Sequence, residues 1–326
     1  MAQPPKPLFV FFGIEGGATC CHVVEDRMFV GSQMGRVEMY GMATKIREET
    51  VYVDTEQRRI QSIDSTSSND VFIHIRAHAI IRLHRKHQAD TWTLVDTITT
   101  DHVGFCNSLL VASHPQRLHL LAVSSDEQRI PFLCWTDVSD GLEKSNQSRS
   151  DSCKIGDSVA DTMPMCMSRG YSKEGEEQEV LVGMEDGRMA VFKEKERGFE
   201  CEEMIKFGKE PIFSVASCSK WVAAGCARAP IFLMARQDPG SIREVHYPPD
   251  SAGCSSITFS PNEKQLLAGF SDGSIRVFSC QRLTILLALT STHSASITSL
   301  IWRHPDDGEV VIATSSDSTV SLWKLR

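Results

Sequence analysis

The sequence predicts an all-β fold, a single seven-bladed β-propeller over residues 1–326 in which each blade is a four-stranded antiparallel sheet. Three observations predict it. One hairpin pattern occurs twice, as VLVGMEDGRMAVF at residues 180–192 and as LLAGFSDGSIRVF at residues 266–278. Weaker copies recur along the chain at a nearly constant spacing. No long helical period interrupts them.

Seven copies of the hairpin can be counted. Their last residues are Tyr40, Leu83, Trp135, Phe192, Met234, Phe278 and Trp323, at successive intervals of 43, 52, 57, 42, 44 and 45 residues. Each copy is two alternating strands joined by a tight turn of Gly, Asp or Ser, which is the signal of a β-hairpin. The two long intervals indicate insertions, a polar loop at about residues 139–151 and an acidic loop at about residues 173–179.

A further alternating segment precedes each hairpin, as in SSITFS at residues 255–260, and another follows all but the last, as in TILLAL at residues 284–289. Four strands per unit at a period of roughly 40–45 residues predict a propeller of the WD-repeat type. The last unit lacks a fourth strand, and the strand LFVFF at residues 8–12 has no unit of its own. Because an open ring would expose two sheet edges, we expect residues 8–12 to complete the last blade.

Side chains that stabilise such blades are clearest in the seventh unit, although no unit ends in a Trp-Asp dipeptide. We expect His293, Asp317 and Trp323 to form a buried hydrogen-bond network with a hydroxyl from Thr314 or Ser315. Asp186 and Asp272 occupy the equivalent turn position in two other units. These residues are therefore interpreted as structural.

Composition and motifs disfavour several classes of function. The net charge of −8 argues against a broad nucleic-acid-binding surface, and no run is long enough to span a membrane. The eleven cysteines include no CxxC pair, so we expect reduced thiols, no metal and no cofactor. The glycine-rich segment at residues 13–20 lacks the ending of a phosphate-binding loop, and no other segment carries a catalytic motif. We expect a non-enzymatic cytoplasmic protein, with a nuclear share left open.

Several segments resemble one named family along nearly the whole chain: HVGFC at residues 102–106, MPMCM at 163–167, KEPIFSV at 209–215 and HSASITSLIW at 293–302. They look like the guanine nucleotide-binding protein subunit β-like protein 1 family, which includes ASTRA-associated protein 1. The resemblance implies a WD-repeat adaptor linked to the co-chaperone assembly, the TTT complex, that matures phosphatidylinositol 3-kinase-related kinases. It also implies a monomer within a hetero-complex. True G-protein β subunits carry an N-terminal coiled-coil helix that holds the γ subunit. Only about seven residues precede the first predicted strand here, so we expect no G-protein role.

A partner surface is predicted from the direction of the strands. Because neighbouring strands are antiparallel, the loop entering each blade and the turn between its second and third strands lie on one rim. The candidate partner-binding residues on these loops are His102, Met163, Pro164, Glu210, Pro211, Arg76, His78, Glu185, Asp186 and Arg228. Such a mixture of Met, Pro and charge suits protein recognition.

Three alternatives stay open. The basic hairpin at residues 76–87 is either a dock for an acidic segment or a solvated blade face. The protein as a whole could be a WD scaffold unrelated to kinase maturation, such as a ubiquitin-ligase substrate receptor. It could also be a propeller enzyme or a small-ligand binder that uses its central channel.

Overall fold

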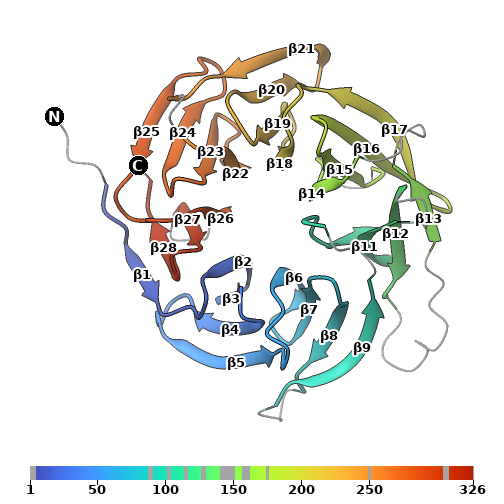
Figure 1. The fold of residues 1–326 in the computed structure, drawn as a ribbon, viewed down its shortest axis with the longest axis vertical. Helices are drawn as coiled ribbons and strands as arrows, with labels where there is room; N and C mark the ends of the chain where they lie inside the picture. Colours follow the sequence, from blue (N-terminus) through green and yellow to red (C-terminus); the bar gives the residue numbers. More distant parts are fainter. Residues whose placement is uncertain are drawn as a thin grey trace.

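The computed structural model describes residues 5–86, 91–100, 104–113, 117–125, 130–139, 151–155, 162–173, 176–248, 251–303 and 308–325. In these residues the chain forms twenty-eight strands in seven four-stranded antiparallel sheets and no helix. The sheets follow one another around a ring, with the first strand of each toward the centre (Figure 1). The seven-bladed propeller predicted from the sequence is confirmed.

Blades 1 to 4 follow the chain in order. Blade 1 contains β2 (Ala18–Val24), β3 (Arg27–Ser32), β4 (Arg36–Gly41) and β5 (Arg47–Val53). Blade 2 contains β6 (Ile60–Ser67), β7 (Asp70–Ile75), β8 (Ala79–His84) and β9 (Thr93–Thr99). Blade 3 contains β10 (Leu109–Ser113), β11 (Arg117–Ser125), β12 (Pro131–Asp137) and β13 (Asp151–Lys154). Blade 4 contains β14 (Pro164–Arg169), β15 (Glu179–Met184), β16 (Arg188–Lys195) and β17 (Gly198–Lys206).

Blades 5 to 7 complete the ring. Blade 5 contains β18 (Ile212–Ser217), β19 (Trp221–Cys226), β20 (Ile231–Ala235) and β21 (Asp238–Val245). Blade 6 contains β22 (Cys254–Phe259), β23 (Gln265–Phe270), β24 (Ile275–Ser279) and β25 (Ile285–Leu289). Blade 7 contains β26 (Ile297–Arg303), β27 (Val310–Ser315), β28 (Thr319–Trp323) and, from the other end of the chain, β1 (Phe9–Phe12).

The ring closes through β1, which pairs antiparallel with β28 and places Phe9 opposite Leu322 and Phe12 opposite Thr319. The pairing continues one residue further, because the Leu8 amide donates to the Leu322 carbonyl at 2.7 Å. Phe11 points inward and is only 4% exposed. The predicted closure by the N-terminal strand is confirmed.

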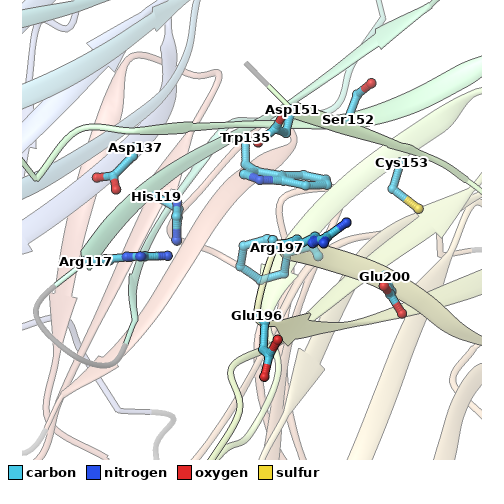
Figure 2. Close-up of a pocket in the computed structure, with 12 residues that line it drawn as sticks. Arg117, His119, Trp135, Asp137, Asp151, Ser152, Cys153, Glu196, Arg197 and Glu200 are labelled. Carbon is cyan, nitrogen blue, oxygen red and sulfur yellow. The ribbon is translucent and has the colours of Figure 1, made fainter. Parts of the chain in front are cut away.

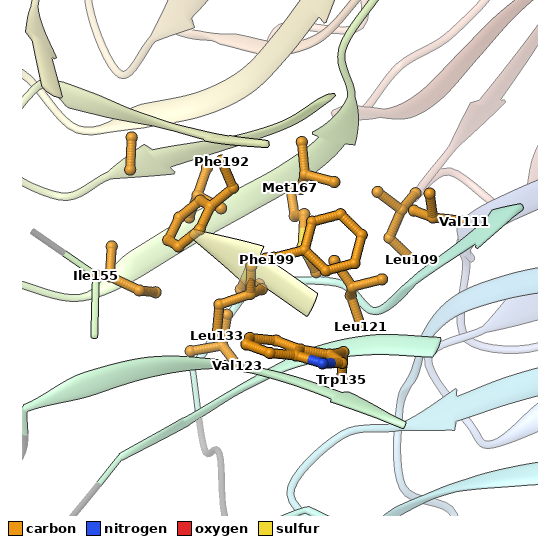
Figure 3. Packing of buried hydrophobic residues seen from close by; sticks show 14 of the residues in the cluster. Leu109, Val111, Leu121, Val123, Leu133, Trp135, Ile155, Met167, Phe192 and Phe199 are labelled. Carbon is orange, nitrogen blue, oxygen red and sulfur yellow. The ribbon is translucent and has the colours of Figure 1, made fainter. Parts of the chain in front are cut away.

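Hydrophobic clusters join each blade to the next. Between blades 3 and 4, Trp135 and Phe199 meet edge to face, with ring centres 5.8 Å apart, among aliphatic side chains of the same cluster (Figure 3). Glycine on the second strand permits the closest approach between blades, since a Cβ there would meet a side chain of the next blade at 2.4–2.7 Å. The four glycines are Gly31, Gly183, Gly225 and Gly269. This contact explains why glycine recurs at that position of the hairpin.

Most of the polar loop lies outside the described residues, which include only Ser139 and Asp151 of it. Of the acidic loop, only residues 174–175 lie outside them. In the part of the chain that is described, no helix has the length and hydropathy of a membrane span.

A candidate partner-binding face

The two predicted loop classes meet on one face of the ring. In six blades, a backbone amide of the turn between the second and third strands donates to a carbonyl of the loop that enters the first strand. The pairs are Gln33 to Gly17, Arg76 to Arg59, Glu185 to Met163, Ala227 to Pro211, Ser271 to Gly253 and Ser316 to Ser296, at 2.8–3.0 Å. Because this hydrogen bond repeats around the ring, turns far apart in sequence form one continuous face.

The central channel opens at this face into a cavity of about 820 Å³. We call its rim the channel mouth, defined by Arg59, Gln61, Phe105, Met165, Glu185, Pro211 and Phe213. Two aromatic rings are accessible there, with Phe105 49% and Phe213 37% exposed. The Arg76 guanidinium lies 4.4 Å from the centre of the Phe105 ring. Exposed aromatic rings beside charged groups are typical of protein interfaces.

Blades 4 and 5 hold most of the accessible predicted residues. Met163 is 42% exposed, and Glu185 is exposed beside it. Glu210 and Arg228 form a solvent-exposed ion pair, with Oε2 and Nε 4.0 Å apart. Pro211 is half-buried at the channel mouth, where its carbonyl accepts from Ala227. These side chains come together as a mixed apolar and charged surface.

Two predicted partner-binding residues have local structural contacts. Pro164 is buried because it is the first residue of β14, where it pairs with Met184, and does not lie at the tip of a loop. Asp186 accepts from the Arg188 amide at 3.1 Å and pairs with the Arg188 side chain. Asp272 makes the equivalent turn bond to the Ser274 amide at 2.9 Å. His102 lies outside the described residues.

Blade 7 contains a buried polar network. His293 Nδ1 lies 3.2 Å from Asp317 Oδ2, and its Nε2 lies 2.7 Å from Ser321 Oγ. Trp323 Nε1 donates to the same hydroxyl at 2.7 Å. Burial lowers the pKa of His293. Asp317 also accepts from the Thr319 amide at 3.1 Å, so the network ties the turn to the sheet.

Hydroxyls of two strands take part in this network: Ser321 of the third strand bonds to His293, and Ser315 of the second strand accepts from the Asp317 amide at 3.2 Å. Thr314 Oγ1 instead lies 2.8 Å from Thr298 Oγ1, and Ser315 Oγ donates to the Ala295 carbonyl at 2.9 Å. In a β-strand, every second side chain lies on the same face of the sheet. A neighbouring strand can therefore supply a hydroxyl to the same network.

The basic hairpin divides into two parts. Arg82 forms a two-point ion pair with Asp70, with both N–O distances 2.9 Å. Arg85 pairs with Glu49 at 2.5 Å. Arg76 and His78 lie instead in the turn on the channel-mouth face. Arg82 of β8 and Arg85 just after this strand therefore stabilise blades, and only the turn of this hairpin adds to the candidate face.

Sequence reasoning missed Phe105, Phe213 and Arg59 at the channel mouth. Both phenylalanines lie inside the segments that carry the family resemblance, HVGFC and KEPIFSV. An exposed aromatic residue cannot be recognised from an apolar strand pattern. Closure of the propeller decides whether its side chain packs against a neighbouring blade or faces the channel.

Among the described residues of the channel, burial raises the pKa of each thiol, and none has a lowered pKa. Burial raises the pKa of Cys20 to about 11 and of Cys166 to about 12, whereas reactive thiols have a lowered pKa. Burial also raises the pKa of Asp64 to about 6, against the opposing effect of Arg169. Among the described residues, no three His, Cys, Asp or Glu side chains are placed to hold a metal ion.

A second cavity, of about 650 Å³, lies in the outer cleft between blades 3 and 4 (Figure 2). Trp135 and His119 line it from blade 3, and Arg197 and Glu200 line it from blade 4. His119 is buried, and its Nδ1 has no hydrogen-bond partner among the described residues. The charged side chains of this cleft are of both signs, so it does not indicate one class of ligand.

Seven four-stranded blades around a central channel, with a face of loops at its mouth, define a seven-bladed β-propeller, and two of its repeats are similar to the WD type. Residues 241–279 and 285–324 match the WD domain, G-beta repeat family. Over 348 aligned residues, covering 99% of this chain and 97% of the relative, the sequence is 24% identical to guanine nucleotide-binding protein subunit beta-like protein 1 of Mus musculus. The resemblance predicted from the sequence is therefore found along the whole chain.

Shorter similarities occur to two proteins of another name. The chain is 31% identical over 78 residues to the probable cytosolic iron-sulfur protein assembly protein 1 of Phaeosphaeria nodorum, covering 24% of this chain and 18% of the relative. It is 40% identical over 55 residues to the protein of that name from Penicillium rubens, covering 17% and 12% of the two chains. These matches are local.

Proposed function

We propose that the protein is a non-enzymatic adaptor that assists the co-chaperone-dependent maturation and stability of phosphatidylinositol 3-kinase-related kinases. The observation that carries the proposal is the accessible surface of blades 4 and 5 around the channel mouth. The family-like segments MPMC, MEDG and KEP all lie in these blades. The whole-length similarity to the β-like protein 1 supports the same reading. The protein would act in the cytoplasm, and the proposal leaves its nuclear share open.

The chemistry of this surface favours a protein as its partner. Met163 and Phe213 present apolar area, and Glu185 and Glu210 add negative charge at its border. Apolar residues at the centre and charged residues at the rim are the usual arrangement of an interface. Charges at the rim act mainly on the association rate and its salt dependence. The co-chaperone assembly would therefore meet this face with basic residues opposite the two glutamates.

Co-purification of the co-chaperone subunits from cells tests the proposal, with the wild type compared with the double variant Glu185→Lys and Glu210→Lys. Both side chains are solvent-accessible, so each change should alter unfolding free energy by less than about 0.5 kcal/mol. The control is Glu196→Lys, an exposed residue between β16 and β17 at the other end of blade 4. Glu194 is less suitable, because its side chain is only 14% exposed.

We expect the wild type and the control to retain the co-chaperone subunits and the double variant to lose them. A wild type that retains none of them, but captures ubiquitin-ligase subunits instead, would refute the kinase-maturation role. Equal retention by the double variant would refute the choice of face and leave the adaptor role standing.

A further inference from the structure

The outer strands of the seven blades differ in charge. Five of them, β5, β9, β13, β17 and β21, contain charged residues within the strand. The other two, β25 with sequence ILLAL and β1 with sequence FVFF, contain none. Natural proteins usually protect sheet edges with charge, because an edge strand exposes unpaired backbone groups. These two edges lack that protection.

The two charge-free edges belong to neighbouring blades and lie on the same side of the ring (Figure 1). Four large side chains there are accessible: Leu8 is 57%, Phe9 37%, Ile285 42% and Leu286 50% exposed. We call these four residues the apolar flank. Phe9 pairs with Leu322 and Ile285 with Phe278, so the flank lies at the ends of the strands away from the channel mouth.

Basic side chains border the apolar flank. Lys6 precedes β1, Arg282 precedes β25 and Lys324 follows β28, and all three are exposed. None of them forms an ion pair with a described residue, although the whole chain carries a net charge of −8. Glu309 follows Gly308, which lies near the Lys324 side chain, and it accepts a hydrogen bond from Trp302 Nε1 at 3.2 Å. Among the described residues, three exposed cations therefore border the apolar flank.

These observations point to an occupant of one kind. The outward backbone groups of β25 have no strand partner in the sheet, and an extended chain can satisfy them by pairing. The apolar side chains favour a segment rich in Val, Ile or Thr. The basic border favours acidic residues next to that segment. A second copy of this chain would bring the same basic border against itself, so self-association is disfavoured.

We propose that the apolar flank docks an extended, mainly apolar segment of a partner protein bordered by Asp or Glu, and that this segment adds to blade 6 as a strand beside β25. Leu8 and Phe9 of the next blade extend the apolar surface that the segment covers. The site is independent of the channel mouth, so an adaptor can hold two partners, or two parts of one partner, on different faces.

The test uses the full chain and a fluorescent synthetic peptide, EEVTVTVEE, followed by fluorescence anisotropy. Its counterpart KKVTVTVKK has the opposite border charge. We expect the acidic peptide to bind at least tenfold more tightly than the basic one, and Leu286→Lys to weaken it by tenfold or more. The matched control is Leu94→Lys on β9, where the leucine is 58% exposed on a strand that already contains Asp96. This control should bind the peptide like the wild type.

Amide hydrogen exchange locates the peptide. We expect slower exchange at residues 285–289 when the acidic peptide is bound, and no change at residues 47–53 of the charged edge of blade 1. The double variant at Glu185 and Glu210 should bind the peptide normally, which separates this site from the channel-mouth proposal.

Four results would overturn the proposal. They are no binding of the acidic peptide, equal binding of both peptides, equal loss in Leu286→Lys and Leu94→Lys, or protection outside blades 6 and 7. Two further measurements identify another occupant. A dimer in sedimentation that Leu286→Lys dissociates would make the partner a second copy of this chain. Binding to phosphatidylserine vesicles that requires Leu286, without peptide binding, would make it a lipid surface.

Discussion

Closure of the ring by β1 makes a sharp prediction, because two adjacent phenylalanines in that strand have opposite environments. Phe11 is 4% exposed and packs among side chains of blades 7 and 1, with its ring 5.0 Å from that of Tyr40. Phe12 is 75% exposed. The strand, its backbone pairing and the residue type are the same, so only burial separates the two positions.

Replacing Phe11 by Ala removes a buried aromatic side chain and leaves a cavity. Such changes cost about 3–5 kcal/mol of unfolding free energy, a large part of the roughly 5–15 kcal/mol that holds an ordinary domain together. Phe12→Ala should cost less than about 0.5 kcal/mol. Urea unfolding followed by tryptophan fluorescence measures both, with the midpoint shifted and the slope unchanged. A loss below about 1 kcal/mol in Phe11→Ala, or equal losses in both variants, would refute closure by this strand.

Three other predictions concern stability and the thiols. Ser321→Ala should lower unfolding free energy by about 1–3 kcal/mol, because it leaves the buried Trp323 Nε1 without its acceptor; a change below 0.5 kcal/mol in urea unfolding would contradict the network. Burial lowers the pKa of His22 from its usual 6.5 to about 4, so the unfolded chain binds a proton there more readily than the folded chain, and stability should fall as pH drops from about 6.5 to 4. His22→Gln should reduce that fall and the exposed His246→Gln should not, as measured by unfolding at pH 7 and pH 4.5. All eleven cysteines are free thiols and none is fully exposed. A thiol reagent, used without reductant, should therefore modify eleven cysteines in urea and few in the native protein. A count of nine or fewer modified cysteines in urea would reveal a disulfide.

The local pattern of the sequence was sufficient to predict the four-stranded blades. Alternation of apolar residues and a Gly or Asp turn are encoded within about a dozen neighbouring residues, so the hairpins ending at Phe192 and Phe278 could be recognised directly. The pairing of residues 8–12 with the last blade could be predicted by counting strands. Only that blade lacked a fourth strand, and only this strand had no blade of its own. The meeting of the two loop classes followed from antiparallel geometry alone.

The tertiary structure decided which side chains are available. Pro164 looks like a loop residue in sequence and is buried in the register of β14, whereas Phe213 looks like a core residue and is exposed at the channel mouth. Many side chains in a propeller meet a partner on the neighbouring blade, far away in the sequence, as with Gly31 and Ile60 or with Arg169 and the Leu110 carbonyl, which are 59 residues apart. The sequence alone determined the repeating unit because its signals are local. The accessible surface depended on contacts between units, which exist only once the ring has closed.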